Sequence, residues 1–491
     1  MTTEQPNYYA LLGLKTDATP EMIQQAFASL RAKFAKKIGD PKKSPQFQQV
    51  AYAYEVLSDP DRRSLYDSLL QETRPPALRV DVLPSRDKVA VLDAPQLVYL
   101  LVNVLPPQQT EDTRLPLNLC LVLDRSTSMQ GERLNRVKTA VELLLDRLGA
   151  DDIISVVTFS DRAEVLLPAG SVQNKAQLLG KVRTMTASGG TEIYQGLLHG
   201  VEQMRQVSLA AHTNHLILLT DGHTYGDADQ CLQLARETAA QGIGITAFGI
   251  GSEWNDQFLD RLVSPSGGQS GYIDDPAQII DFLQKRIKGL GAVYARNVKM
   301  LLEFPQSVSL RYAFKLSPYA QPIATHLREL QLGDIEGRKP LTFLLEINIP
   351  PQPVESRIKI PVALQADIPS QQMKEQDFRQ QLQLLVLTEV VDVPPPETLL
   401  RAVRMLNMYR LNEKVWEDVE SGQVHAATRR MQHLTTRFLE AGQTKLAQQA
   451  NLEAERLAQM GTLSTEGRKS LKFGTRALLT QTADWEEDDS V

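Results

Sequence analysis

The hydrophobic residues near the N-terminus recur at helical spacing. The segment Thr19-Pro20-Glu21 is typical of a helix start, with an N-cap, a proline in the first turn and an acid near the positive end of the helix dipole. Apolar stripes then run through residues 23–34 and 47–57, on either side of the polar segment Gly39-Asp40-Pro41. Because a short loop joins the two stripes, we predict an antiparallel helical hairpin within a module at residues 1–72.

Further along the chain, short apolar runs alternate with amphipathic stretches. The runs have the length of strands and lie at residues 117–123, 153–159, 215–219 and 243–250. The amphipathic stretches between them include residues 134–148, 193–204 and 231–240. Near-continuous apolar strands separated by helices are typical of a parallel sheet covered on both faces. We therefore predict a doubly wound α/β domain at residues 111–291.

On either side of this domain the pattern is that of strands alone. LRVDVL and LVYLLVNVL precede it, and VKMLLEF, SVSLRYAF, LTFLLEINI, RIKIPVAL and QLQLLVL follow it, separated by turns rich in Pro, Gly and Gln. Runs of this kind indicate a β-sandwich. We predict one sandwich, built from residues 78–110 and 292–393, into which the α/β domain is inserted.

The C-terminal part returns to helical spacing after Pro394-Pro395-Pro396. Residues 394–480 are rich in Leu, Ala, Arg, Glu and Gln, and Gly422 and Gly442 fall where helices are expected to end. Residues 481–491, which contain ADWEEDD, are too acidic and too short to form a core of their own. We predict a helical region followed by an acidic tail.

Composition and charge exclude several classes of protein. The 491 residues are 42% hydrophobic and 23% charged, which is typical of globular proteins. With 53 Lys and Arg against 59 Asp and Glu, the net charge is −6, whereas electrostatic nucleic-acid binders are normally basic. Two cysteines are too few for a disulfide-built secreted scaffold, and neither a signal peptide nor an apolar run near the ~20 residues of a membrane helix is found. We expect a cytoplasmic multidomain protein that binds neither nucleic acid nor membranes.

The strongest chemical signal lies at the predicted carboxyl ends of the α/β strands. Asp124, Ser126 and Ser128 directly follow the first apolar run, and Asp221 follows another in LILLTDG. Thr191, at the end of Ser188-Gly189-Gly190-Thr191, precedes a predicted helix between them. Open α/β sheets bind their ligands at this edge, and a few carboxylates with several hydroxyls suit Mg²⁺, which prefers oxygen ligands. With so few charges, at least one coordination position would be open to an outside oxygen.

This pattern resembles the von Willebrand factor A domain over residues of about 115–288. Asp124, Ser126, Ser128, Thr191 and Asp221 match the parts of that family's metal-ion-dependent adhesion site in the right order. The resemblance implies that these residues surround a divalent cation, Mg²⁺ with Mn²⁺ or Ca²⁺ as alternatives, and that a carboxylate of a protein partner completes its coordination. The flanking strands are similar in layout to bacterial A-domain proteins and to inter-α-trypsin inhibitor heavy chains. The alternative is a helix-capping cluster of Asp and Ser that holds no metal.

The N-terminal module resembles a J domain, from YYALLGL at residue 8 to AYEVLSDPDRRSLYD, which ends at Asp67. J domains carry His-Pro-Asp after their second helix, and that tripeptide engages a heat-shock chaperone ATPase. Ala35-Lys36-Lys37 stands at the matching positions here. The basic residues Arg31, Lys33, Lys36 and Lys37 could hold an acidic partner, although a solvated helix face is the interpretation that we favour. We therefore expect a degenerate, J-like module that does not work as a co-chaperone.

Other signals carry less weight. The segment GIGITA, which begins at Gly242, matches a dinucleotide-binding fingerprint in letters only, because it lies at the start of a predicted strand. Gly242 is better interpreted as the end of the preceding helix. His223, two residues after Asp221, is expected to be an exposed loop residue, and Cys120 and Cys231 are expected to be buried packing residues.

No set of nucleophile, base and acid emerges from the sequence, and Ser126 stands where a phosphatase would carry a second aspartate. We therefore expect a non-enzymatic protein-interaction or scaffold protein that binds an acidic partner through Mg²⁺. The alternative is a chaperone cofactor or assembly factor that acts through the J-like module and associates with a chaperone ATPase. A hydrolase that uses the metal is a third, less favoured hypothesis.

Overall fold

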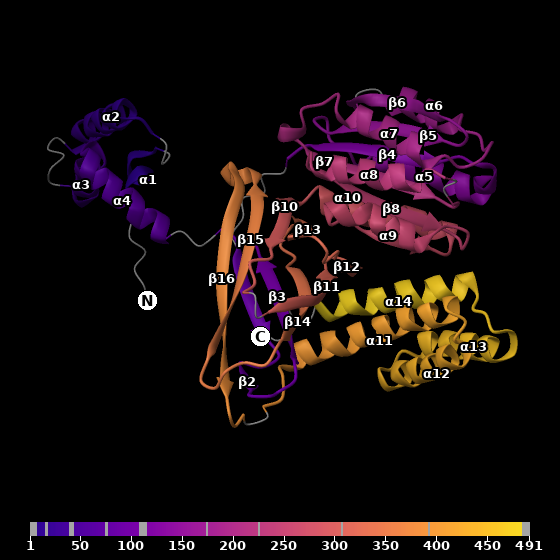
Figure 1. Cartoon of the computed structure of the whole chain (residues 1–491). Coiled ribbons are helices and arrows are strands. Elements are labelled where there is room, and N and C mark those ends of the chain that lie inside the picture. The colour runs from indigo at the N-terminus through magenta and orange to yellow at the C-terminus, as the bar shows by residue number, and fades with distance from the viewer. Residues whose placement is uncertain are drawn as a thin grey trace. The chain divides into compact units, whose positions relative to one another are not determined.

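The computed structural model describes residues 7–14, 18–38, 44–73, 77–107, 115–172, 175–223, 226–305, 308–390 and 393–483 (Figure 1). The chain divides into one compact unit at Met1–Pro76 and another at Ala77–Val491. No helix in the described ranges is both long enough and apolar enough to cross a membrane.

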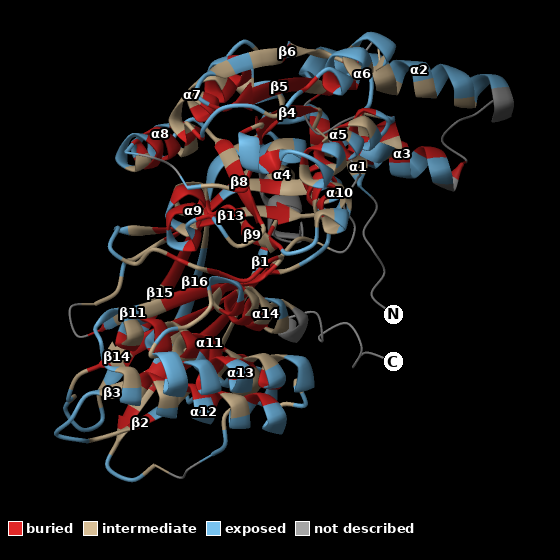
Figure 2. Ribbon diagram, turned by 90° about the vertical axis from the view of Figure 1, so that its right-hand side faces the viewer, coloured by how far each residue is buried: buried red, intermediate tan, exposed pale blue. Residues whose placement is uncertain are grey.

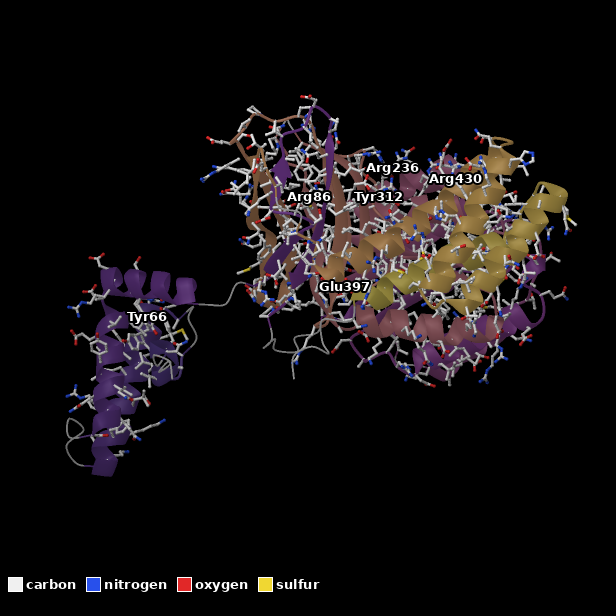
Figure 3. The ribbon with its side chains drawn as sticks, turned by 90° about the horizontal axis from the view of Figure 1, so that it is seen from below. Tyr66, Arg86, Arg236, Tyr312, Glu397 and Arg430 are labelled. Atoms are coloured by element: carbon white, nitrogen blue, oxygen red, sulfur yellow. The ribbon has the colours of Figure 1, made fainter. Side chains whose placement is uncertain are left out.

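The N-terminal unit is helical, as the spacing predicts. Its helices are α1 (Tyr8–Leu12), α2 (Pro20–Ile38), α3 (Pro45–Ser58) and α4 (Pro60–Thr73). Their buried apolar side chains form one core, in which Tyr9, Ile23 and Ala53 are at most 1% exposed. Tyr66, labelled in Figure 3, stacks on Tyr8 with ring centroids 4.3 Å apart, which fixes α4 against α1. The segment Gly39-Asp40-Pro41 lies outside the described residues.

The second unit begins with strands that belong to a β-sandwich. One sheet has the order β1 (Arg79–Pro84), β3 (Gln96–Leu105), β14 (Leu341–Ile349), β11 (Ser309–Ser317), β12 (Gln321–Pro322). The other has the order β13 (Glu329–Glu336), β10 (Val293–Leu301), β15 (Arg357–Ile368), β16 (Met373–Leu387), β2 (Lys88–Ala90). Each sheet contains strands from before and after the α/β domain, and their inner faces share one apolar core. The prediction of an α/β domain inserted in a sandwich is therefore confirmed.

The α/β domain has a single sheet in the order β6 (Ala163–Ser171), β5 (Ile153–Phe159), β4 (Leu117–Asp124), β7 (Thr213–Thr220), β8 (Ile243–Ile250), β9 (Ser270–Ile273). The strands are parallel except at the β5–β6 edge, where pairing is antiparallel. Helices α5 (Glu132–Leu145), α6 (Lys175–Arg183) and α10 (Ile279–Leu290) cover one face. Helices α7 (Ile193–Met204), α8 (Ala228–Ala239) and α9 (Asp256–Val263) cover the other, so the strands are buried between two layers (Figure 2). The doubly wound fold is confirmed.

The C-terminal region consists of α11 (Glu397–Glu420), α12 (Val424–Glu440), α13 (Thr444–Met460) and α14 (Thr465–Ala483). Gly422 and Gly442 follow α11 and α12 with φ of 75° and 71°, a left-handed conformation that glycine adopts without steric cost. Leu406 and Tyr409 of α11 and Leu479 of α14 pack on the sheet that contains β3, β11 and β14. This region is therefore fixed to the sandwich. Residues 484–491, with most of the predicted acidic tail, lie outside the described residues.

The shared sandwich predicts how fragments of the chain behave. A fragment of residues 292–393 lacks β3, which pairs with β14 along nine positions, and loses Val98, Leu100, Val102 and Val104 from the core. Its open sheet edge and uncovered apolar face should make it aggregate or stay unfolded. A fragment of residues 107–288 keeps the whole α/β sheet and should be soluble. The NMR spectra of the two fragments test this, and a well-dispersed spectrum from residues 292–393 would contradict it.

Candidate metal centre

The candidate site lies where the sheet reverses its strand order. β4 is flanked by β5 on one side and β7 on the other, and the chain leaves the carboxyl ends of these strands in opposite directions. In open α/β sheets this switch point forms a crevice in which ligands bind. Asp124 is the last residue of β4, and Asp221 directly follows β7.

Asp124 is held in place by hydrogen bonds from both sides. Its Oδ1 accepts from the backbone N–H of Ser126 at 2.8 Å, and its Oδ2 accepts from the Thr220 hydroxyl at 2.7 Å. The side chain is fully buried. Burial raises the pKa of Asp124 to about 6, although the hydrogen bonds from Ser126 and Thr220 oppose the rise. The carboxylate is therefore fixed in direction and costly to keep ionised without a cation.

A row of oxygen atoms joins the two carboxylates. The hydroxyls of Ser126 and Ser128 lie 3.0 Å apart, and the Ser128 hydroxyl donates to Asp221 Oδ1 at 2.7 Å. Ser126 and Asp221 are buried, whereas Ser128 is exposed, so the row reaches the surface at Ser128. The structure thus brings these predicted residues together.

Thr191 reaches the same place from the loop before α7. Its hydroxyl lies 3.0 Å from the position that a β-carbon at Gly222 would occupy, so it faces the backbone next to Asp221. The loop is tied to the serine segment, because the Thr127 N–H donates to the Gly189 carbonyl oxygen at 3.0 Å. It is also tied to the loop after β5, where Asp161 Oδ1 accepts from the Gly190 N–H at 2.7 Å. All the candidate residues therefore converge.

Three residues that the sequence analysis missed support the site. Thr220 bonds Asp124, Asp161 fixes the loop of Thr191, and Arg133 of α5 donates through Nη1 to Asp221 Oδ2 at 2.5 Å. Thr220 stands directly before Asp221 in the sequence, so its position could have indicated its role. Asp161 and Arg133 give no such local signal, because only the folded sheet brings their loops to the site.

The donors that converge are two carboxylates and three hydroxyls. The described residues contain no group of three or more His, Cys, Asp or Glu that could hold a metal, so a cation here would depend on hydroxyl ligands. This set of hard oxygen donors fits Mg²⁺ better than a metal that prefers sulfur or imidazole.

The other residues that the sequence singled out have no direct part in the candidate site. His223 is exposed next to the site, and Cys120 and Cys231 are free and buried, as expected. Burial raises the pKa of Cys120 to about 12, so its thiol is not an active nucleophile. Gly242 has φ of 74° and ends the turn after α8, as the sequence indicates.

Comparisons with known proteins agree with the α/β fold that carries this site. Residues 118–285 match the von Willebrand factor type A domain. Residues 397–481 match a family described as "Sll0103-like, C-terminal alpha-helical domain". A protein of Synechocystis sp., "Uncharacterized protein sll0103", is 28% identical over 330 residues, which are 62% of this chain and 78% of that protein.

A solved structure has the same fold over most of the chain. It is a von Willebrand factor type A protein from Catenulispora acidiphila, with a TM-score of 0.65 and 15% identity, and the match covers 82% of this chain and 96% of that one. At this identity the likeness shows the fold alone.

The N-terminal unit requires a correction. Residues 7–67 match the DnaJ domain, and the chaperone protein DnaJ of Carboxydothermus hydrogenoformans is 41% identical over 63 residues, 12% of this chain and 16% of that one. The expectation of a degenerate module is therefore wrong, because the helices and their core are those of a DnaJ domain. The sequence nevertheless has no histidine before His199, and Ala35, Lys36 and Lys37 lie within helix α2.

Proposed function

We propose that this protein is a non-enzymatic interaction or scaffold protein that captures an acidic residue of a protein partner through a divalent cation. Asp124, Ser126, Ser128, Thr191 and Asp221 would hold the cation, with Mg²⁺ the best fit to these donors and Mn²⁺ or Ca²⁺ the alternatives. The bound cation would supply an open coordination position for the partner's carboxylate oxygen. The match to the von Willebrand factor type A domain supports a role in protein–protein interaction.

The observation that carries the proposal is the row of oxygens from Asp124 to Asp221. Asp124 is fully buried and Asp221 is 1% exposed. Within the described part of the chain, Arg133 is the one cationic side chain that contacts the pair, and it bonds Asp221 rather than Asp124. Buried carboxylates are normally paired or coordinate metals. Asp124 has hydrogen-bond donors but no cationic partner among the described residues, which favours a metal ion there.

The proposal is tested by capture of partners with and without the cation. The full chain, immobilised in an excess of Mg²⁺, should retain a partner that EDTA releases. An Asp124→Ala variant should fail to retain that partner in Mg²⁺. Identical partners with Mg²⁺, with EDTA and with the variant would contradict the proposal.

A chaperone cofactor that acts through the DnaJ domain is the second candidate, and the match at residues 7–67 supports it. The known partners of DnaJ domains are Hsp70-type ATPases. The two roles are compatible within one chain, because the DnaJ domain and the candidate metal centre lie in different compact units.

The DnaJ unit gives a separate prediction. Because the sequence has no histidine before His199 and therefore no His-Pro-Asp tripeptide in this unit, we expect a fragment of residues 1–76 to fold but not to accelerate ATP hydrolysis by an Hsp70 chaperone. A steady-state ATPase assay with a complete DnaJ domain as the positive control measures this. Acceleration comparable to that control would establish the chaperone role instead.

A further inference from the structure

Arg133 connects the candidate metal centre to a neighbouring loop. Its Nη1 donates to Asp221 Oδ2 at 2.5 Å and to the Ser128 carbonyl oxygen at 3.4 Å. Its Nη2 lies 2.8 Å from the position that a β-carbon at Gly251 would occupy. One guanidinium therefore touches both a candidate ligand of the cation and the first residue after β8.

The segment from Gly251 to Asn255, which we call the β8–α9 loop, is closed on itself. Gly251 has φ of 69°, and its carbonyl oxygen accepts from the indole N–H of Trp254 at 2.7 Å. Trp254 is 2% exposed and packs against Tyr272 and Phe473. Because the indole anchors both ends of this short segment, a displacement of Gly251 moves the loop as a unit.

Helix α14 of the C-terminal region holds the same loop. The ammonium of Lys469 donates to the carbonyl oxygens of Ser252 and Trp254, both at 2.5 Å, and lies 4.3 Å from the centroid of the Trp254 ring. Lys469 is 1% exposed, so its ammonium bonds these carbonyl oxygens in place of water molecules. Figure 1 shows α14 running alongside the α/β domain.

We propose that cation binding at the metal centre is coupled to the C-terminal helical region through Arg133, the β8–α9 loop and Lys469. The inference rests on the proposed function, since it requires the centre to bind a cation. A divalent cation and the Arg133 guanidinium are both positive and compete for the Asp221 carboxylate. Cation binding displaces Arg133 from Asp221 toward the loop, where Glu253 offers an exposed carboxylate whose Oε1 accepts from the Ser252 hydroxyl at 3.2 Å.

Movement of the loop changes the hydrogen bonds of Lys469, because the acceptors of its ammonium are carbonyl oxygens of that loop. Coupling between two sites is reciprocal. If cation binding changes the free energy of the α14 contact, a change in that contact alters the cation affinity by the same factor. Cation binding at the metal centre would thus change the contact between the α/β domain and helix α14 of the C-terminal region.

Calorimetric titration of the full chain with Mg²⁺ alone tests the reciprocal effect. Lys469→Met keeps the length and apolar stem of the side chain but removes the ammonium, and it should change the Mg²⁺ dissociation constant about fivefold or more. Arg133→Ala removes the competitor and should tighten Mg²⁺ binding. Lys445→Met, an exposed lysine on the neighbouring helix α13, is the matched control and should bind Mg²⁺ as the wild type does.

Amide hydrogen exchange gives the second readout. Mg²⁺ should alter exchange of the β8–α9 loop and of residues 465–476 in the wild type, and Arg133→Ala should bind Mg²⁺ without altering residues 465–476. If the wild type binds Mg²⁺ while α14 exchange and the Lys469→Met affinity stay unchanged, the coupling is overturned and the proposed function stands. If the wild type binds no divalent cation, the proposed function fails and the coupling with it.

Discussion

Mg²⁺ is expected to raise the melting temperature of the full chain, and an Asp124→Ala variant is expected to lose that response completely. A ligand that binds only the folded state stabilises by about 2.7 kcal/mol at a hundredfold excess over its dissociation constant. For a domain of about 150–250 residues, which is the size range of the α/β domain at residues 111–291, that corresponds to a shift of about 5–10 °C. Ser126→Ala and Ser128→Ala each remove one neutral oxygen donor and should reduce the shift without abolishing it.

The control is an acid of the same domain that lies away from the site. Asp151 is exposed in the turn before β5, whereas the candidate centre lies at the opposite end of that strand. Asp151→Ala should keep the full Mg²⁺ shift. Asp161 is unsuitable for this purpose, because its carboxylate accepts from Gly190 and fixes the loop that carries Thr191. An Asp124→Ala protein that still responds to Mg²⁺ would rule out this site.

Without Mg²⁺, a variant that lacks the Asp124 carboxylate should be more stable than the wild type. Burial, rather than repulsion from Asp221, is the largest influence that raises the pKa of Asp124, and Asp221 already has Arg133 as its counter-ion. Keeping Asp124 ionised at neutral pH therefore costs folding free energy in the metal-free protein. Asp124→Asn keeps the shape of the side chain and should melt above the metal-free wild type in EDTA, as a thermal scan can measure.

The sequence alone predicts where the two carboxylates of the candidate site lie, because each of them follows a strongly apolar strand. β4 and β7 are buried along their whole length, and parallel strands of one sheet end at the same edge. The apolar pattern alone therefore places Asp124 and Asp221 at one edge of the sheet. Thr191 was placed before a predicted helix between these strands, its match to the adhesion site came from the resemblance, and the folded chain adds its close approach to Gly222.

Other elements escaped prediction for physical reasons. β6 reads AEVLLPAGS and is an edge strand with partly exposed residues, so it lacks the continuous apolar run of its neighbours. β9 is only four residues long, and β13 contains Gly333 and Asp334. Short or interrupted strands depend on pairing with the sheet more than on their own pattern.

The contact between α14 and the α/β domain also gave no sequence signal. Lys469, Lys472 and Arg476 lie on a helix that reads as an ordinary charged one, and charged residues are rarely buried unless they are paired. The acidic partners of Lys472 and Arg476 are Asp256 and Asp260, at a sequence separation of 216 residues for each bond. A pairing at that separation follows from the tertiary structure alone.

This buried network should make Asp260→Asn one of the most destabilising single changes in the chain. Asp260 accepts from Arg476 Nη2 at 2.6 Å and lies 2.8 Å from the Lys472 ammonium. The side chains of Arg476 and Lys472 are 4% and 1% exposed. Removing the acid takes away the carboxylate that these two cations share, and breaking a buried pair in this way costs about 3–5 kcal/mol.

The wild type should lose the same interaction in acid. Burial alone would raise the pKa of Asp260, but Arg476 and Lys472 outweigh it and hold that pKa well below its usual range. A carboxyl with a lowered folded pKa stabilises the fold above its unfolded pKa and loses that contribution as the pH falls toward the folded value. The stability of the wild type should therefore fall below about pH 4, whereas the Asp260→Asn variant should show a weaker dependence.

Denaturant titration of the full chain, with proteolysis of the α14 segment as a second readout, measures both effects. Asp281→Asn, an exposed acid in the first turn of α10, is the matched control and should change the free energy of unfolding by less than about 1 kcal/mol. Adding Arg476→Met to Asp260→Asn should recover part of the loss, because the second change removes a buried charge that the first left unpaired. If the two changes are instead additive, Asp260 and Arg476 do not stabilise the contact as a pair, and α14 is held to the α/β domain mainly by Trp254 and Phe473, whose rings lie 5.8 Å apart.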